Sequence, residues 1–120
     1  MNYDELCESI FNINPMIRHA AVYHESGEKL AGGIRDGVIS LIPEAVTGDS
    51  IRFSIIRWNT RKMLSQYIGK CKYAMAEYEK VRRSMIPLGD KELLLVSMET
   101  EVNHDVIIEQ ILKLCAELGK

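Results

Sequence analysis

The chain has 120 residues, of which 47% are hydrophobic and 27% are charged, with 15 Lys and Arg against 17 Asp and Glu. This length and composition are typical of one globular domain, so we expect residues 1–120 to form a single domain. The formal net charge of -2 excludes the strong positive field that draws a whole protein to nucleic acid or to an anionic membrane.

The first predicted element is a short helix over residues 3–12. Leu6, Ile10 and Phe11 recur at helical spacing. Acidic residues occupy its first turns, where the helix dipole favours negative charge. The helix must end before Pro15, because proline disfavours a helical conformation in the residue that precedes it.

Two short strands are predicted next, over residues 17–23 and 30–33. Both segments are rich in small and apolar residues, and a polar stretch ending in Glu28 and Lys29 separates them. Gly27 lies in that stretch and can adopt the positive φ that tight hairpins require. The pattern therefore predicts a β-hairpin.

A long helix follows, after an apolar segment over residues 37–42 whose structure the pattern leaves open. Pro43 marks either a break or the start of a helix. Asp49 or Ser50 is the predicted N-cap, and Gly69 is the predicted C-terminal stop. Apolar residues at i, i+3 and i+4 spacing predict a broad apolar face. They are Ile51, Ile55, Ile56, Trp58, Met63, Leu64, Tyr67 and Ile68.

Residues 72–88 carry conflicting signals. Their alanines, methionines and charged residues favour a helix by propensity. Segment 92–98, however, has the apolar run of a buried strand, and the loop before it over residues 87–91 forms a hairpin that needs a partner strand directly upstream. We therefore predict a strand over 82–88 and a preceding strand over 73–79.

A final helix is predicted from Asn103 or His104 to Gly119, because its apolar residues follow helical spacing. The complete order is helix, two strands, long helix, three strands, helix. This order predicts an α/β fold of the α+β type, in which a central antiparallel five-stranded sheet packs against the helices.

Two short motifs add to this order of elements. The first is Ala20-Ala21-Val22-Tyr23 followed by Gly27 and Leu30-Ala31-Gly32-Gly33, and the second is Ile86-Pro87-Leu88-Gly89-Asp90 running into Leu93-Leu94-Leu95-Val96. With these hairpins the chain resembles the roadblock domain, the profilin-like fold of dynein light chains. It is also similar to uncharacterised small archaeal domains. The resemblance implies a homodimer, or a heterodimer with a similar domain, joined through sheets or long helices, and a possible small GTPase partner.

Motifs of metal sites and membrane segments are lacking. Only His19 and His24 approach the spacing of a ligand pair, and five residues apart on a strand they point to opposite faces. Cys7, Cys71 and Cys115 are far apart, which favours free thiols in a reducing compartment. No apolar run reaches the roughly 18 residues of a membrane span. We expect no metal, no membrane insertion and a cytoplasmic location.

Catalytic motifs are lacking as well. Glu77 and Glu79 share a strand face, as a general acid and base would, but a solvated face is the simpler interpretation. The Gly-rich segment 31–37 lacks the GxxxxGK[ST] order of a phosphate-binding loop. Its glycines are expected to allow a turn or the close approach of another backbone. We therefore predict no enzymatic activity and no cofactor.

Two sets of residues are candidate sites. Trp58 between Arg57 and Arg61 indicates either a core tryptophan with a basic edge, a protein interface, or a base-stacking site, in that order of preference. The leading prediction is a dimerising scaffold or regulatory module without nucleic-acid partners. The alternative is a small-molecule sensor with a pocket between the sheet and its covering helix. The residues predicted to line that pocket are Tyr23, Tyr73, Met75 and Tyr78.

Overall fold

The computed structural model describes residues 2–118. Within them, three helices and five strands follow one another in the predicted order, and the predicted fold class is confirmed. Their bounds are α1 (Tyr3–Phe11), β1 (Ile17–His24), β2 (Lys29–Ile34), α2 (Glu44–Ile68), β3 (Ala74–Glu77), β4 (Arg82–Pro87), β5 (Glu92–Met98) and α3 (His104–Leu118).

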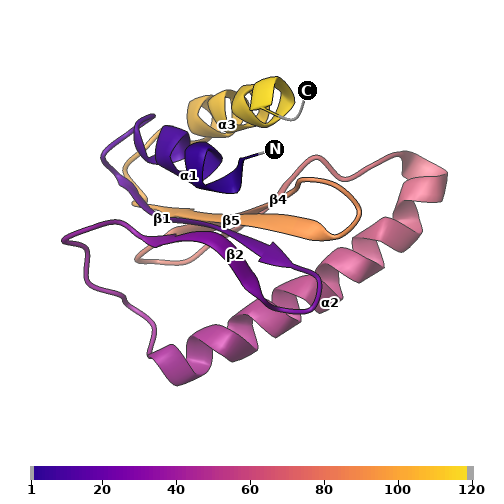
Figure 1. The fold of residues 1–120 in the computed structure, drawn as a ribbon, viewed down its shortest axis with the longest axis horizontal. Helices are drawn as coiled ribbons and strands as arrows, with labels where there is room; N and C mark the ends of the chain where they lie inside the picture. Colours follow the sequence, from indigo (N-terminus) through magenta and orange to yellow (C-terminus); the bar gives the residue numbers. More distant parts are fainter. Residues whose placement is uncertain (1, 119–120) are drawn as a thin grey trace.

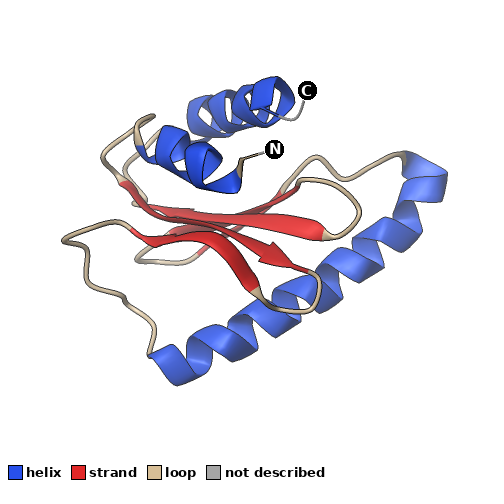
Figure 2. Cartoon of the chain, in the orientation of Figure 1, coloured by secondary structure: helices blue, strands red, loops and turns tan. Residues whose placement is uncertain are grey.

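The five strands form one antiparallel sheet in the order β2-β1-β5-β4-β3. The long apolar strand β5 is central, and β2 and β3 are the two edges. Helices α1 and α3 cover one face, whereas α2 crosses the other face alone (Figure 1). Figure 2 shows the resulting three layers, with the sheet between its helices.

Each face of the sheet has its own core, because alternate side chains of a strand point to opposite faces. On β5, Leu94, Val96 and Met98 join the core under α1 and α3. Leu93 and Leu95 join the core under α2, where Trp58 is the largest buried side chain. The chain therefore buries apolar residues on both faces of one sheet.

The predicted start of the long helix is wrong. Helix α2 begins at Glu44 with Pro43 as its N-cap, so Asp49 and Ser50 lie inside the helix and do not cap it. The fixed φ of proline is compatible with a helix start, and the Pro43 carbonyl accepts hydrogen bonds from the backbone N–H groups of residues 46 and 47. The stop is confirmed: Gly69 has a φ of 90° and donates its N–H to the Ser65 carbonyl.

The extended structure predicted for residues 73–88 is confirmed. Strand β4 pairs with β5 along its length and with β3 on its other side. Strand β3 is shorter than the predicted 73–79 because the Tyr78 N–H donates to the Val81 carbonyl and closes the turn to β4. Pairing with the neighbouring strands thus overrides the helical propensity of this segment.

Candidate functional site

Helix α2 has two apolar faces rather than the single broad one predicted. Ile51, Ile55 and Trp58 pack against the sheet, whereas the other apolar side chains are exposed. We define the outer stripe as the exposed apolar residues of α2 that recur at the a and d positions of a heptad. They are Val46, Phe53, Ile56, Met63 and Tyr67.

The outer stripe lies opposite the side of α2 that contacts the sheet. Its side chains are exposed, from 49% for Val46 to 78% for Tyr67. In Figure 1 the lower side of α2 faces no other part of the described residues, and its C-terminal end extends past the sheet. A row of large exposed apolar side chains on one helix face is typical of an interaction site.

The tryptophan predicted as a candidate interface anchor belongs to the core. Trp58 is 1% exposed and packs against Tyr23 and Leu93 in the core under α2, so its ring is not available to a partner or to a stacked base. Lys62 covers it further, with Nζ 4.0 Å from the ring centroid. Of the three interpretations, the structure supports the core tryptophan with a basic edge.

A cavity of about 190 Å³ lies between α2 and the sheet. It brings together residues from the two predicted sets. Arg57 and Arg61 line it from α2, and Tyr23, Met75 and Tyr78 line it from the sheet and its turn. Neither Tyr73 nor Trp58 belongs to the lining.

The remaining charged groups of the lining were not predicted. Arg83 on β4 and Arg18 and His19 on β1 also face the cavity. Arg83 and buried Met85 are two residues apart on β4, so their side chains point to the same face of the sheet. The strand assignment therefore predicts that Arg83 points toward α2. No such signal exists for the loop that closes one side of the cavity.

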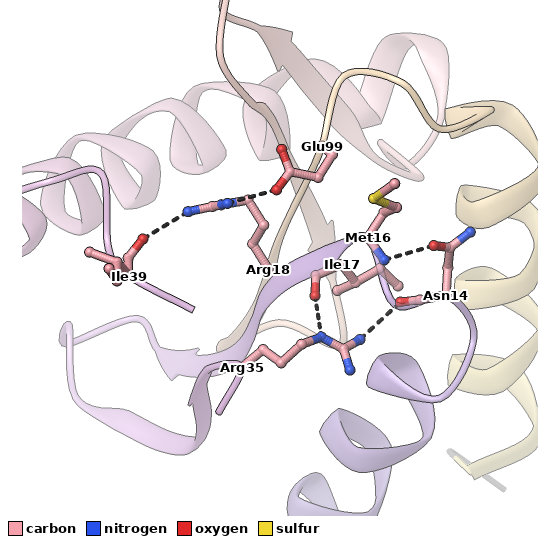
Figure 3. A network of polar contacts seen from close by, with 7 residues as sticks. All are labelled: Asn14, Met16, Ile17, Arg18, Arg35, Ile39 and Glu99. Atoms are coloured by element: carbon pink, nitrogen blue, oxygen red, sulfur yellow. Dashed lines mark hydrogen bonds and ion pairs between the residues drawn. The ribbon is translucent and has the colours of Figure 1, made fainter. Parts of the chain in front are cut away.

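That loop, residues 35–43 between β2 and α2, is held by arginine side chains (Figure 3). Arg18 donates one hydrogen bond to Glu99 at 2.7 Å and another to the Ile39 carbonyl at 2.8 Å. Arg35 donates to the carbonyl of Ile17 at 2.6 Å and to that of Asn14 at 2.9 Å. The positive charge of Arg18 is therefore already paired, and its role is to fix the cavity wall.

The field inside the cavity is positive. Burial lowers the pKa of His19, and the nearby Arg83 guanidinium lowers it further. Burial raises the pKa of Tyr23, while Arg83 acts in the opposite direction. At neutral pH both side chains are therefore uncharged beside a permanently charged arginine.

The chemistry that the described residues can perform is limited. No three His, Cys, Asp or Glu side chains among residues 2–118 lie together as metal ligands would. The three cysteines are free thiols, and burial raises the pKa of Cys7 and of Cys115 to about 11, so both stay protonated at neutral pH. Glu77 pairs with Arg82, whose hydrogen bond lowers the pKa of the carboxyl group. No helix within these residues could span a membrane.

The whole chain, residues 1–120, matches the family described as "Family of unknown function (DUF6659)". The chain belongs to this DUF6659 family. No curated protein matches it by sequence.

Solved structures similar to this DUF6659 protein share its fold at low identity. MglB of Myxococcus xanthus has a TM-score of 0.76 at 13% identity, covering 99% of this chain and 93% of its own. A roadblock/LC7 domain of Streptomyces avermitilis has a TM-score of 0.72 at 12% identity, covering 98% and 95%. A profilin of Schizosaccharomyces pombe has a TM-score of 0.63 at 11% identity, covering 99% and 100%.

These similarities confirm the predicted roadblock-like, profilin-like fold. At such identities they establish the fold alone, because one fold carries many functions. The function must therefore be inferred from the surfaces that this chain builds on the fold.

Proposed function

We propose that this DUF6659 protein is a non-enzymatic, cytosolic scaffold or regulatory module that dimerises through α2. The outer stripe is the observation that carries the proposal. Five large apolar side chains on one helix face are exposed to water, although the opposite face of the same helix already packs on the sheet. Burying them against a second apolar surface is favourable in proportion to the area removed from water.

A second copy of α2 suits the outer stripe. From Val46 to Tyr67 the stripe is about 32 Å long, at about 1.5 Å per residue, and its midpoint lies near Ile56. A two-fold axis through that midpoint would lay two helices antiparallel, so that each Val46 end meets the Tyr67 end of its partner. Heptad spacing is the pattern with which paired helices interlock.

The edge strand β3 is a second surface at which copies of the chain are expected to associate. It has only four residues and pairs with β4 on one side only. Exposed aromatic rings, those of Tyr73 and Tyr78, flank it. An unpaired edge with apolar neighbours is a template for a further strand, so strand pairing with a second copy would cover this edge.

Sedimentation of charged variants tests the dimer. We expect the parent protein to sediment at twice the 13.7 kDa chain mass at micromolar concentration. The double variant Ile56→Glu, Met63→Glu should dissociate at least about a hundredfold more readily, because the interface would have to bury unpaired carboxylates. Both side chains are more than half exposed, so the variant monomer should stay folded.

A matched control uses a similarly exposed apolar residue elsewhere. Val106 on α3 is 49% exposed and lies on the other side of the sheet, so Val106→Glu should remain a dimer. A parent protein that is monomeric at micromolar concentration would refute the homodimer. If the control dissociates as readily as the double variant, α2 is not the interface.

We also propose association with a small Ras-like GTPase, which rests on the roadblock resemblance. It is tested with a purified Ras-like GTPase of the same organism, loaded with GDP or with a non-hydrolysable GTP analogue. We expect a complex with one nucleotide state in sedimentation velocity runs. If neither state binds, the GTPase association is withdrawn, while the dimer is judged on its own experiment.

A further inference from the structure

Three arginines without a carboxylate partner line the cavity between α2 and the sheet. Arg57 and Arg61 lie one turn apart on α2, and Arg83 reaches the same cavity from β4. We propose that this cavity binds a compact organic anion, a carboxylate or phosphate group on a short apolar body, through these three guanidinium groups. The proposal is independent of the dimer.

Within the described residues, the guanidinium groups of these three arginines donate hydrogen bonds to uncharged groups alone. Arg57 donates to the Ser54 hydroxyl at 3.1 Å, and Arg83 donates to the Ser50 hydroxyl at 2.8 Å. Arg61 reaches only the Met85 sulfur, at 3.8 Å. A guanidinium group has several N–H donors in a planar fork, so each arginine keeps donors for a ligand.

None of the acidic residues that the structure describes pairs with these three positive charges. Within residues 2–118, no carboxylate oxygen lies within 4.0 Å of these three side chains. The full sequence has more acidic than basic residues, yet no Asp or Glu of the described part of the chain lines the cavity. Arg61 and Arg83 are only partly exposed, and cations of that kind are normally paired. A bound anion would supply the missing counter-charge.

The size and walls of the cavity define the rest of the ligand. At about 190 Å³ it falls below the roughly 300 Å³ of drug-sized ligand sites, so it suits a compact anion and not a nucleotide. Apolar side chains form much of the wall and require a short apolar body. They include Ile34, Leu41, Ile42, Ile51, Val81 and Met85.

A small molecule fits the positions of the arginines better than the carboxylate of a protein partner does. Arg61 and Arg83 are half-buried and line the cavity from α2 and β4, whereas Arg57 is exposed. The outer stripe, where a partner is expected, lies on a different side of α2. An acidic side chain of a docked protein would meet Arg57 first and the other two poorly.

Titration with simple probes tests the proposal. Benzoate supplies a carboxylate on a short apolar ring, inorganic phosphate supplies charge alone, and benzamide has the shape of benzoate without the charge. By NMR, we expect benzoate to shift the backbone amide signals of residues 57–61 and 83, benzamide to leave them unchanged, and phosphate to bind more weakly than benzoate. Equal shifts with benzamide, or none with either anion, would overturn the proposal.

Substitutions add a second criterion. Arg61→Gln and Arg83→Gln should each weaken benzoate binding about tenfold or more, because each removes a charge-assisted hydrogen bond. Arg52→Gln is the control, since Arg52 is exposed on α2, pairs with Asp49 and lies outside the cavity. Unchanged affinity in both cavity variants refutes the site. Should a variant fail to fold, the parent titration decides, and binding of an acidic peptide without any small anion would indicate a protein partner instead.

Discussion

At Gly32 on β2 the fold leaves no room for a side chain. Its φ is 80°, and a Cβ built there would lie 2.1 Å from the Ala20 carbonyl oxygen and 2.8 Å from the Cys7 sulfur. The close backbone approach expected of the Gly-rich segment is therefore present. We predict that Gly32→Ala lowers the free energy of unfolding by about 2–4 kcal/mol, from the positive φ and the clash with backbone. Urea denaturation measures this loss.

Gly48 provides the matched control for Gly32. It lies inside α2, and a Cβ there would meet no atom within 4 Å. Gly48→Ala should therefore stabilise the protein by up to about 1 kcal/mol, because alanine has the higher helix propensity. If Gly32→Ala changes the stability by less than about 0.5 kcal/mol, the backbone geometry described for β2 is wrong.

His19 gives the stability of the protein a dependence on pH. Its pKa in the folded protein lies below the ordinary histidine value of 6.5, so below pH 6.5 the unfolded chain binds a proton that the folded protein does not. The free energy of unfolding should therefore fall as the pH drops from 6.5 to about 5. Below about pH 5, carboxylates also bind protons and add to the pH dependence. His19→Gln should flatten the curve in this window, as measured by urea denaturation at several pH values. Parallel curves for parent and variant would contradict the lowered pKa.

Among the elements, α2 shows how far periodicity predicts structure. Helical spacing placed Ile51, Ile55 and Trp58 correctly in a helix, but the same spacing occurs on its exposed side. Which stripe is buried depends on where the sheet lies, and helical periodicity alone does not give that position. The sequence leaves a helix start at Pro43 open but favours Asp49 or Ser50 as the cap, because no side chain caps the observed start at Glu44 and the proline carbonyl begins the hydrogen-bond ladder instead.

The strands were more predictable, because their neighbours constrain one another. The apolar run of β5 requires hydrogen-bonded partners on both sides, and this requirement correctly overrode the helical propensity of residues 73–88. The cavity was less predictable. Tyr23 and Arg57 were each proposed for a site, but for different ones, and only the packing of α2 on the sheet brings them together.

Arg35 connects three segments of the chain. Besides the carbonyls of Ile17 and Asn14, it donates to the Phe11 carbonyl at 2.7 Å, and its guanidinium lies 4.9 Å from the Phe11 ring centroid. It thus ties the end of α1 and the start of β1 to the loop after β2. A lysine cannot reproduce this planar fork, so Arg35→Lys should lower the free energy of unfolding by about 2–4 kcal/mol in urea denaturation.

The control for Arg35 is Arg52→Lys, which changes the same groups at an exposed ion pair and should cost less than about 0.5 kcal/mol. Arg35→Lys should also broaden the NMR signals of residues 35–43, because the loop loses its anchor. Equal stability of the two variants would mean that the network in Figure 3 does not hold the loop.

For the whole molecule, the two proposed surfaces lie on different sides of one helix. The outer stripe faces away from the sheet, whereas the arginine-lined cavity opens between α2 and the sheet. Charged substitutions in the outer stripe should therefore abolish dimerisation and preserve anion binding. The arginine substitutions in the cavity should weaken anion binding and preserve the dimer. The fold family suggested the dimer, but the position of these surfaces depends on this chain's own side chains.

Contacts between protomers would show whether two α2 helices pair. In a dimer mixed from isotope-labelled and unlabelled chains, filtered NMR experiments detect only contacts between protomers. We predict nuclear Overhauser effects near the two-fold axis at Ile56, and between Val46 of one protomer and Tyr67 of the other. Contacts confined to α3 or β2, or none in a sample shown to be dimeric, would contradict the account.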